Sequence, residues 1–87
     1  MSDQKKDAEK KVKTCLLELM RMPTGDKMSL KLFYEEAQRL VRFSRDSHIT
    51  LPGEVTRWLG SAEERARDPI RSATESADIA RYLSTLA

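Results

Sequence analysis

The apolar residues of this chain recur at intervals of three or four, which places them on one face of a helix. This spacing predicts helical segments over residues 3–22, 29–44, 51–59 and 61–86, the last of which restarts at residue 69. No stretch has the alternating, β-branched pattern that is typical of a strand. The pattern therefore predicts an all-α protein, a small bundle of about four helices that forms a single domain over residues 1–87.

The first predicted helix has an unusually wide apolar face. Its core-facing positions are Val12, Cys15, Leu16, Leu19 and Met22. Leu17 and Met20 extend this face beyond the stripe that an ordinary surface helix buries. The turn signal Pro-Thr-Gly-Asp at residues 23–26 ends the helix. Because the first two turns are almost entirely polar, we expect residues 1–8 to fray.

The second predicted helix begins at Ser29, a residue type that often caps helices, and it carries two apolar lines. The main stripe consists of Leu30, Phe33, Tyr34, Ala37, Leu40 and Val41. Leu32 and Phe43 lie about 140° from the centre of that stripe, at about 100° per residue, and stack on one line. Either another helix of the same domain covers this second line, or the line is a surface for a partner.

Capping residues set the expected boundaries in the second half of the chain. Thr50 is the expected N-cap of the third helix. Ser61 and Glu64 match a capping box, in which the acidic residue reaches back toward the capping serine. Asp68 followed by Pro69 is a further start signal. The expected inward face of the last helix is mostly small and consists of Ala73, Ser76, Ala77 and Ala80, with Ile79, Leu83 and Leu86 toward its end.

A chain of 87 residues buries a smaller share of its surface than a larger domain does, so its core is thin. Disulfides cannot add stability, because Cys15 is the only cysteine, and a lone thiol is typical of a reducing compartment. Cys15 and the only histidine, His48, do not suffice for a four-ligand zinc site. We expect no metal and no cofactor, and we expect the helices of a partner to supply further stabilisation.

The charges are balanced, with 16 Lys and Arg against 14 Asp and Glu and a net charge of +2. A nucleic-acid module usually carries a stronger basic excess, so nucleic acid is not the favoured partner. No apolar run approaches the ~18 residues of a membrane span, and the N-terminus lacks the apolar core of a signal peptide. We therefore expect an intracellular protein without membrane contact, cytoplasmic by default, with the nucleus left open.

The sequence offers no convincing catalytic group. Cys15 lies within an apolar stripe, where a thiol behaves as a small hydrophobic side chain, and His48 lies in a polar connector. The acidic pairs at 35–36 and 63–64 are adjacent in sequence, so their side chains point about 100° apart on a helix. The glycines do not have the spacing of a phosphate-binding loop. We therefore predict that the protein is not an enzyme and has no small-molecule substrate.

Residues 49–60 resemble the first helix of the helix-turn-helix in excisionase-like and other small regulators. The residues that carry the resemblance are Leu51, Glu54, Val55, Trp58, Leu59 and Gly60. The resemblance implies a degenerate helix-turn-helix around residues 49–71, with phosphate contacts from Arg57, Arg65, Arg67 and Arg71. The segment that would enter the major groove has only two turns before Asp68 and Pro69 interrupt it. DNA binding is therefore the alternative and not the main hypothesis.

The main hypothesis is a non-enzymatic helical protein-interaction module, such as a small regulator, adaptor or complex subunit. It would dock through amphipathic helices onto another protein or onto a copy of itself, and its thin core and spare apolar positions favour this role. The candidate partner-binding residues are Leu17, Met20, Leu32, Phe43 and Trp58. For Trp58 the competing interpretation is a place in the core, where the only tryptophan of a small domain often lies.

Overall fold

The computed structural model describes residues 2–86, with side chains from residue 4 onward, and all regular structure in that range is helical. The helices are α1 (Ser2–Arg21), α2 (Lys27–Asp46), α3 (Gly53–Gly60), α4 (Ala62–Arg67) and α5 (Pro69–Leu83). This confirms the predicted all-α class and the small bundle. The expected fraying of residues 1–8 stays a prediction for residues 2–8, and Met1 lies outside the described residues.

Two of the expected helix starts differ from the structure. α2 begins at Lys27 because Asp26, and not Ser29, is its N-cap: the Asp26 carboxylate accepts a hydrogen bond from the Ser29 backbone N–H at 2.8 Å. This backbone hydrogen bond is the main reason why the pKa of Asp26 is lowered. Thr50 caps no helix, since α3 starts at Gly53, after Pro52, without a side-chain cap.

The start of α5 is as predicted. The Asp68 carboxylate accepts a hydrogen bond from the Arg71 backbone N–H at 3.0 Å, and Pro69 occupies the first turn. Asp68 is both the C-cap of α4 and the N-cap of α5. The expected final segment is therefore two helices joined at one residue.

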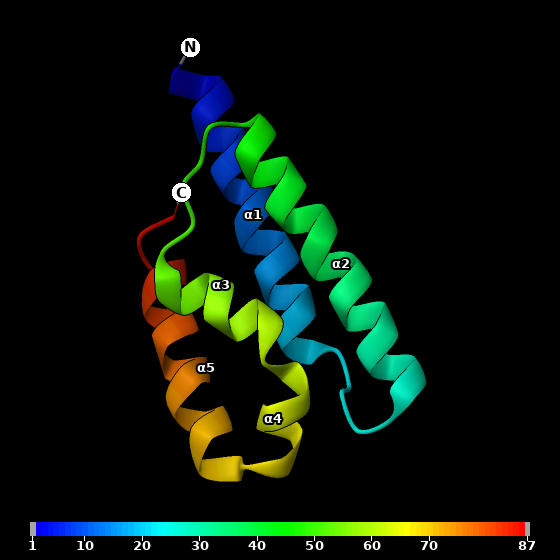
Figure 1. The fold of residues 1–87 in the computed structure, drawn as a ribbon. Coiled ribbons are helices and arrows are strands. Elements are labelled where there is room, and N and C mark those ends of the chain that lie inside the picture. Colours follow the sequence, from blue (N-terminus) through cyan, green and yellow to red (C-terminus); the bar gives the residue numbers. More distant parts are fainter. Residues whose placement is uncertain (1, 87) are drawn as a thin grey trace.

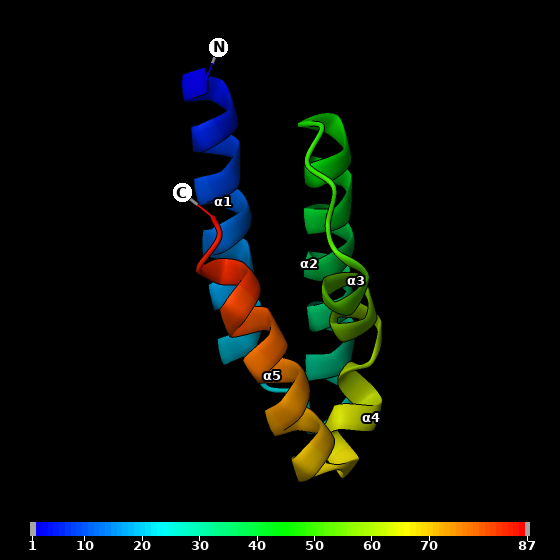
Figure 2. The ribbon, with the colours of Figure 1, turned by 90° about the vertical axis from the view of Figure 1, so that its left-hand side faces the viewer.

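The helices form two layers, as Figures 1 and 2 show. α1 and α2 lie antiparallel as a long hairpin, and α3, α4 and α5 pack across it as a second unit. Within this unit α5 packs against both α3 and α4, and it also contacts α1. The core between the layers consists of Val12, Leu16, Leu19, Phe33, Ala37, Leu40, Val55, Trp58, Leu59, Ala62, Ile79 and Leu83.

A buried arginine connects the second unit to the hairpin. Arg65 of α4 is only 7% exposed, and its guanidinium carbon lies 4.4 Å from the ring centroid of Trp58 and 5.6 Å from that of Phe33. Its Nη1 donates hydrogen bonds to the Trp58 carbonyl oxygen and, at 2.8 Å, to Ser61 Oγ. The same nitrogen lies 3.7 Å from Glu75 Oε2. The arginine thus contacts α2, α3 and α5 from its place on α4.

Glu75 supplies the negative charge for this cluster. Its carboxylate accepts hydrogen bonds from Arg71 Nε at 2.9 Å and from Ser61 Oγ at 3.1 Å. Burial raises the pKa of Glu75, but these two hydrogen bonds and the charges of Arg71 and Arg65 outweigh it, so the pKa is lowered. The expected capping box at Ser61 is therefore wrong, since no cap hydrogen bond forms there and the hydroxyl bonds to Glu75 instead.

The inward face of α5 also differs from the prediction. Ile79 and Leu83 are buried as expected, whereas Ala73, Ala77 and Ala80 are exposed. The inward face is centred on Ile79, and Glu75 lies on the same side of the helix, within reach of Arg65. A pattern that counts every acid as outward-facing cannot anticipate this face.

We expect Glu75→Gln to lower the free energy of unfolding by about 2 kcal/mol at neutral pH, because it removes the counter-charge of a buried guanidinium. Urea denaturation would measure the change. Glu35→Gln is the matched control, since Glu35 is exposed and belongs to no ion pair among the described residues. The control should change stability by less than ~0.5 kcal/mol. Equal effects of the two variants would contradict the role of Glu75.

The contribution of Glu75 should also depend on pH. The folded-state pKa of Glu75 is lowered. Its stabilisation is therefore complete above the unfolded-state pKa of about 4.3 and is lost as the pH falls through the folded-state pKa. The difference in unfolding free energy between the wild type and Glu75→Gln should shrink as urea melts are repeated at progressively more acidic pH. A difference that widens with acidification would contradict this assignment.

The orientation of α5 makes a prediction about its two faces. Ile79 is fully buried, so Ile79→Ala should lower the free energy of unfolding by about 2–5 kcal/mol. Ala77 is exposed, so Ala77→Gln should change it by less than ~0.5 kcal/mol. Denaturant melts of both variants decide between the faces. A strongly destabilised Ala77→Gln would favour the small-residue face that the sequence pattern predicts.

Candidate functional site

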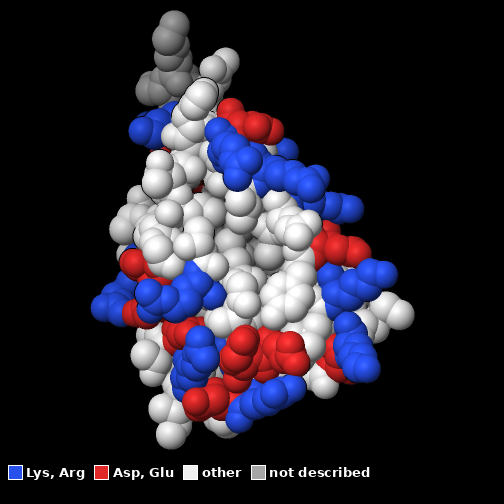
Figure 3. Space-filling view, viewed as in Figure 1, with Lys and Arg blue, Asp and Glu red and all other residues white. Residues whose placement is uncertain are grey.

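A groove runs between α2 and α3 on the face seen in Figure 1, and Figure 3 shows this region as a hollowed, uncharged surface. It consists of two adjoining hollows of about 530 Å³ and 430 Å³, which share Val41, Arg45 and Thr56. We call it the α2–α3 groove. Its lining residues are Tyr34, Ala37, Gln38, Val41, Arg42, Ser44, Arg45, His48, Ile49, Thr50, Leu51, Thr56, Leu59 and Gly60.

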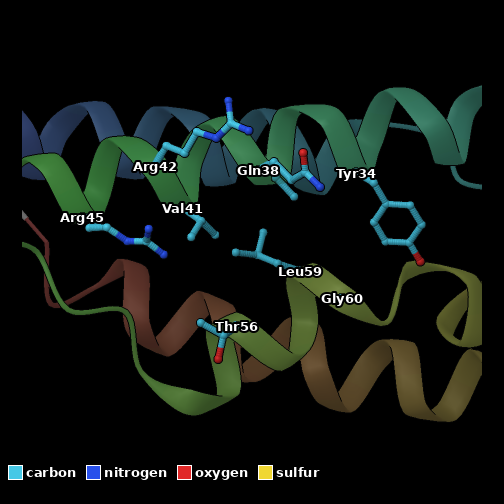
Figure 4. A pocket seen from close by; sticks show the side chains of 9 residues that line it. Tyr34, Gln38, Val41, Arg42, Arg45, Thr56, Leu59 and Gly60 are labelled. Atoms are coloured by element: carbon cyan, nitrogen blue, oxygen red, sulfur yellow. The ribbon is translucent and has the colours of Figure 1, made fainter.

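The floor of the groove is apolar. Ala37 and Leu59 are almost fully buried there, and Val41 is half-buried. In Figure 4 the side chains of Val41 and Leu59 point toward each other across the gap between the helices. The short side chain of Ala37 and the missing one of Gly60 leave the space above this floor open. Thr56 donates its hydroxyl to the Gly53 carbonyl oxygen at 3.0 Å, so this hydroxyl is already satisfied.

Tyr34 closes one end of the groove. Its ring packs edge-to-face on Phe33, with 5.8 Å between the centroids, and its hydroxyl accepts a hydrogen bond from the Glu63 backbone N–H at 3.2 Å. The hydrogen bond also joins α2 to the start of α4. The opposite end lies at the connector after α2, where His48 is exposed and has a left-handed backbone with φ of 59°.

The rim of the groove is basic. Arg42 and Arg45 of α2 are exposed, and neither belongs to an ion pair within the described part of the chain. Arg39, one turn earlier, differs because it pairs with Glu36 at 2.9 Å. In Figure 4 Arg45 extends along the mouth of the groove, and Arg42 extends along the outer side of α2. No Asp or Glu is among the residues that line the two hollows.

The predicted partner-binding residues do not form one surface with this groove. Leu17 and Met20 are 40% and 37% exposed on α1, and Leu32 is 50% exposed on α2. Phe43 lies on the same line of α2 as Leu32, but it is more buried than Leu32. Its ring is half-buried against the core and lies 4.8 Å from Lys11 Nζ, so α1 covers it.

Trp58 belongs to the core, which corrects its assignment as a partner-binding residue. It is 3% exposed and packs edge-to-face on Phe33, with 5.4 Å between the ring centroids. Its burial leaves the indole N–H without a hydrogen-bond partner among the described residues, which is a cost to stability. The aromatic contact and the guanidinium of Arg65 hold the ring inside.

The arginines of the DNA-binding alternative are largely engaged within the protein. Arg65 is buried, and this burial lowers its pKa, so its expected phosphate contact is corrected. Arg67 pairs with Glu63 at 3.0 Å and Arg71 with Glu75 at 2.9 Å. Arg57 is exposed. The segment in the place of a recognition helix, α4, has 6 residues.

Cys15 is half-buried beside Glu18 and Glu36 in a small hollow between α1 and α2. Burial raises the pKa of its thiol, and the two carboxylates raise it further. The thiol is therefore protonated near neutral pH, and this is the less nucleophilic form of the residue.

Sequence reasoning missed the groove because its floor has the same pattern as a core. Ala37 and Val41 belong to the main stripe of the second helix, which a helical wheel assigns wholly to the interior. One signal was available at Arg45. This residue has no acid three or four positions before it, so no carboxylate on its own helix is placed to pair with it in the favoured orientation.

None of the helices in residues 2–86 is long and apolar enough to cross a membrane. Comparison of the chain with protein-family models, with curated proteins and with solved structures gives no match.

The two residues of the second apolar line on α2 should respond differently to truncation. Phe43→Ala should lower the free energy of unfolding by roughly 2 kcal/mol, because its ring packs on the core and under Lys11. Leu32 is half exposed, so Leu32→Ala should cost less than ~1 kcal/mol. Chemical denaturation of both variants would measure these costs. Similar large losses at the two positions would mean that Leu32 is also covered.

Proposed function

We propose that this protein is a non-enzymatic protein-interaction module, and that the α2–α3 groove receives a segment of a partner protein. The observation that carries the proposal is the combination of an apolar floor with a rim of unpaired arginines. Val41, Leu59 and Ala37 supply surface for apolar anchors, and Arg42 and Arg45 supply charge at the edge. Apolar anchors surrounded by polar residues are the usual anatomy of a binding surface.

The dimensions of the groove support a short helical segment as its occupant. From Tyr34 to Arg45 the wall formed by α2 is about 16 Å long, at about 1.5 Å per residue, which matches three turns of a docked helix. Amphipathic helices commonly bind in hydrophobic grooves through residues spaced three or four apart. The groove is open along its length, so a segment of another chain can enter from the side.

The chain length gives a second reason for a binding role. A domain of 87 residues has a thin core, and an occupant that covers Val41 and Leu59 would extend it. A small regulator, adaptor or complex subunit that is stabilised by its partner would have such a core.

We also propose an intracellular location, with the cytoplasm as default, because the only cysteine is a free thiol.

Nucleic-acid binding remains the less favoured alternative. Arg65 is buried, and Arg67 and Arg71 already pair with carboxylates. Phosphate contacts by these residues would first have to break those ion pairs.

Filling the groove should abolish partner binding. Thr56→Trp places a large ring over Val41 and Leu59, whereas Thr74→Trp adds the same ring on the exposed side of α5 as a control. The wild type and both variants would be used for quantitative pull-downs from lysate of the source cells, after circular dichroism confirms their folding. We expect proteins that the wild type and Thr74→Trp recover equally, and that Thr56→Trp recovers at least about tenfold less. Equal recovery by all three would contradict the groove as the binding site.

A further inference from the structure

We infer that the occupant of the α2–α3 groove is an amphipathic helix whose polar flank carries carboxylates at the end that faces Arg42 and Arg45. This inference rests on the proposed function and names the chemistry of its partner. Its basis is the charge distribution around the groove, which is asymmetric although the chain as a whole is nearly balanced, with a net charge of +2.

The arginines of the groove lack internal partners where most other arginines have one. Arg39, Arg65, Arg67, Arg71 and Arg81 each form an ion pair with an acidic residue. Arg42 and Arg45 form none within residues 4–86, and both line the larger hollow, Arg45 at its mouth and Arg42 on the outer side of α2. Among the described residues, no carboxylate lines the groove, and the charged side chains along it are arginines, which disfavour a basic occupant.

The position of the charges gives the occupant a direction. Arg42 and Arg45 lie in the last turns of α2, whereas the opposite end of the groove is closed by Tyr34 near the acidic residue Glu63. Carboxylates near Arg45 are therefore favoured, and carboxylates near Glu63 are not. Between these ends the floor requires apolar side chains over Val41 and Leu59.

A helix fits this floor better than a nucleic acid does. Single-stranded nucleic acids bind through aromatic platforms on which the bases stack. Among the described residues that line the groove, the aromatic rings are those of Tyr34 and His48, which lie at opposite ends, and the Tyr34 ring already packs on Phe33 while its hydroxyl bonds to Glu63. Aliphatic side chains of a helix match Ala37, Val41 and Leu59 directly.

The test is a displayed library of helical peptides of about 14 residues, enough for three to four turns. One face of each peptide is drawn from Leu, Ile, Phe, Met and Ala, and the flanking positions are drawn equally from Glu, Lys, Gln and Ser. Binders to the wild-type chain are kept only if the Thr56→Trp variant does not bind them. Amide chemical shifts of the labelled chain then establish whether each peptide contacts Val41, Thr56 and Leu59.

We expect the groove-bound peptides to be enriched in Glu at one end, and to lose about tenfold in affinity when those residues become Lys. The double variant Arg42→Glu with Arg45→Glu should reverse this preference, and the double variant Arg21→Glu with Arg57→Glu, at two exposed arginines outside the groove, should leave it unchanged. Groove-bound peptides without a preference for Glu would overturn the acidic helix while the proposed function stands.

Two further outcomes would overturn the inference and the proposed function together. If no peptide of the library contacts the groove, both the inference and the proposed function fail. Labelled duplex DNA and single-stranded RNA form the last arm of the experiment. If either binds at the groove more tightly than the best peptide, and loses this binding in the Arg42 and Arg45 variant, the protein partner is overturned in favour of a nucleic acid.

Discussion

A guanidinium placed among aromatic rings keeps its charge, so the fold must bring a carboxylate to it, and in this protein that requirement is met by Arg65 and Glu75. The ion is shielded by Trp58 and Phe33 and hydrogen-bonded by Ser61. Taking an unpaired charge out of water would cost several kcal/mol. Because the four partners lie on α2, α3 and α5 or on the link before α4, this one side chain connects the second unit to the hairpin.

The α2–α3 groove follows from this arrangement. Trp58 and Arg65 hold α3 and α4 close to α2 at the Phe33 end, and the hydrogen bond between Tyr34 and Glu63 reinforces that contact. Toward the other end the facing residues are Val41 and Thr56, and the two helices leave open space between them. The groove is thus wide where the core residues are small and closed where they are aromatic. Partner binding there would add apolar contacts that the short chain cannot supply itself.

Much of the fold could be predicted from the sequence because it depends on local signals. The helix period, the turn after Met22 and the start signal at Asp68 each act over a few residues. Two of the misassigned features involve one long-range contact. The hydroxyl of Ser61 bonds to Glu75 instead of capping, and the side of α5 that carries Glu75 faces inward, so Ala77 faces outward. A pattern that treats every charge as solvated cannot anticipate a buried ion pair.

The candidate site was less predictable for a related reason. A helical stripe shows which residues avoid water, but not which of them a second helix will cover. Ala37 is covered and Val41 only partly so, although both lie on the same stripe of α2. Trp58 differs in the opposite direction from Val41. Tryptophan is common at interfaces, but this one is buried in the core, where Arg65 and Phe33 enclose its ring. Arg42 and Arg45 can be recognised as the rim of a groove only when the position of the apolar floor beside them is known.

Amide hydrogen exchange, compared between the free chain and its purified native complex, would show whether the partner occupies the α2–α3 groove. We expect slower exchange on complex formation in residues 38–45 of α2 and 56–60 of α3, which border the groove. Protection confined to the exposed side of α1 around Leu17 and Met20, with unchanged exchange along the groove, would contradict it.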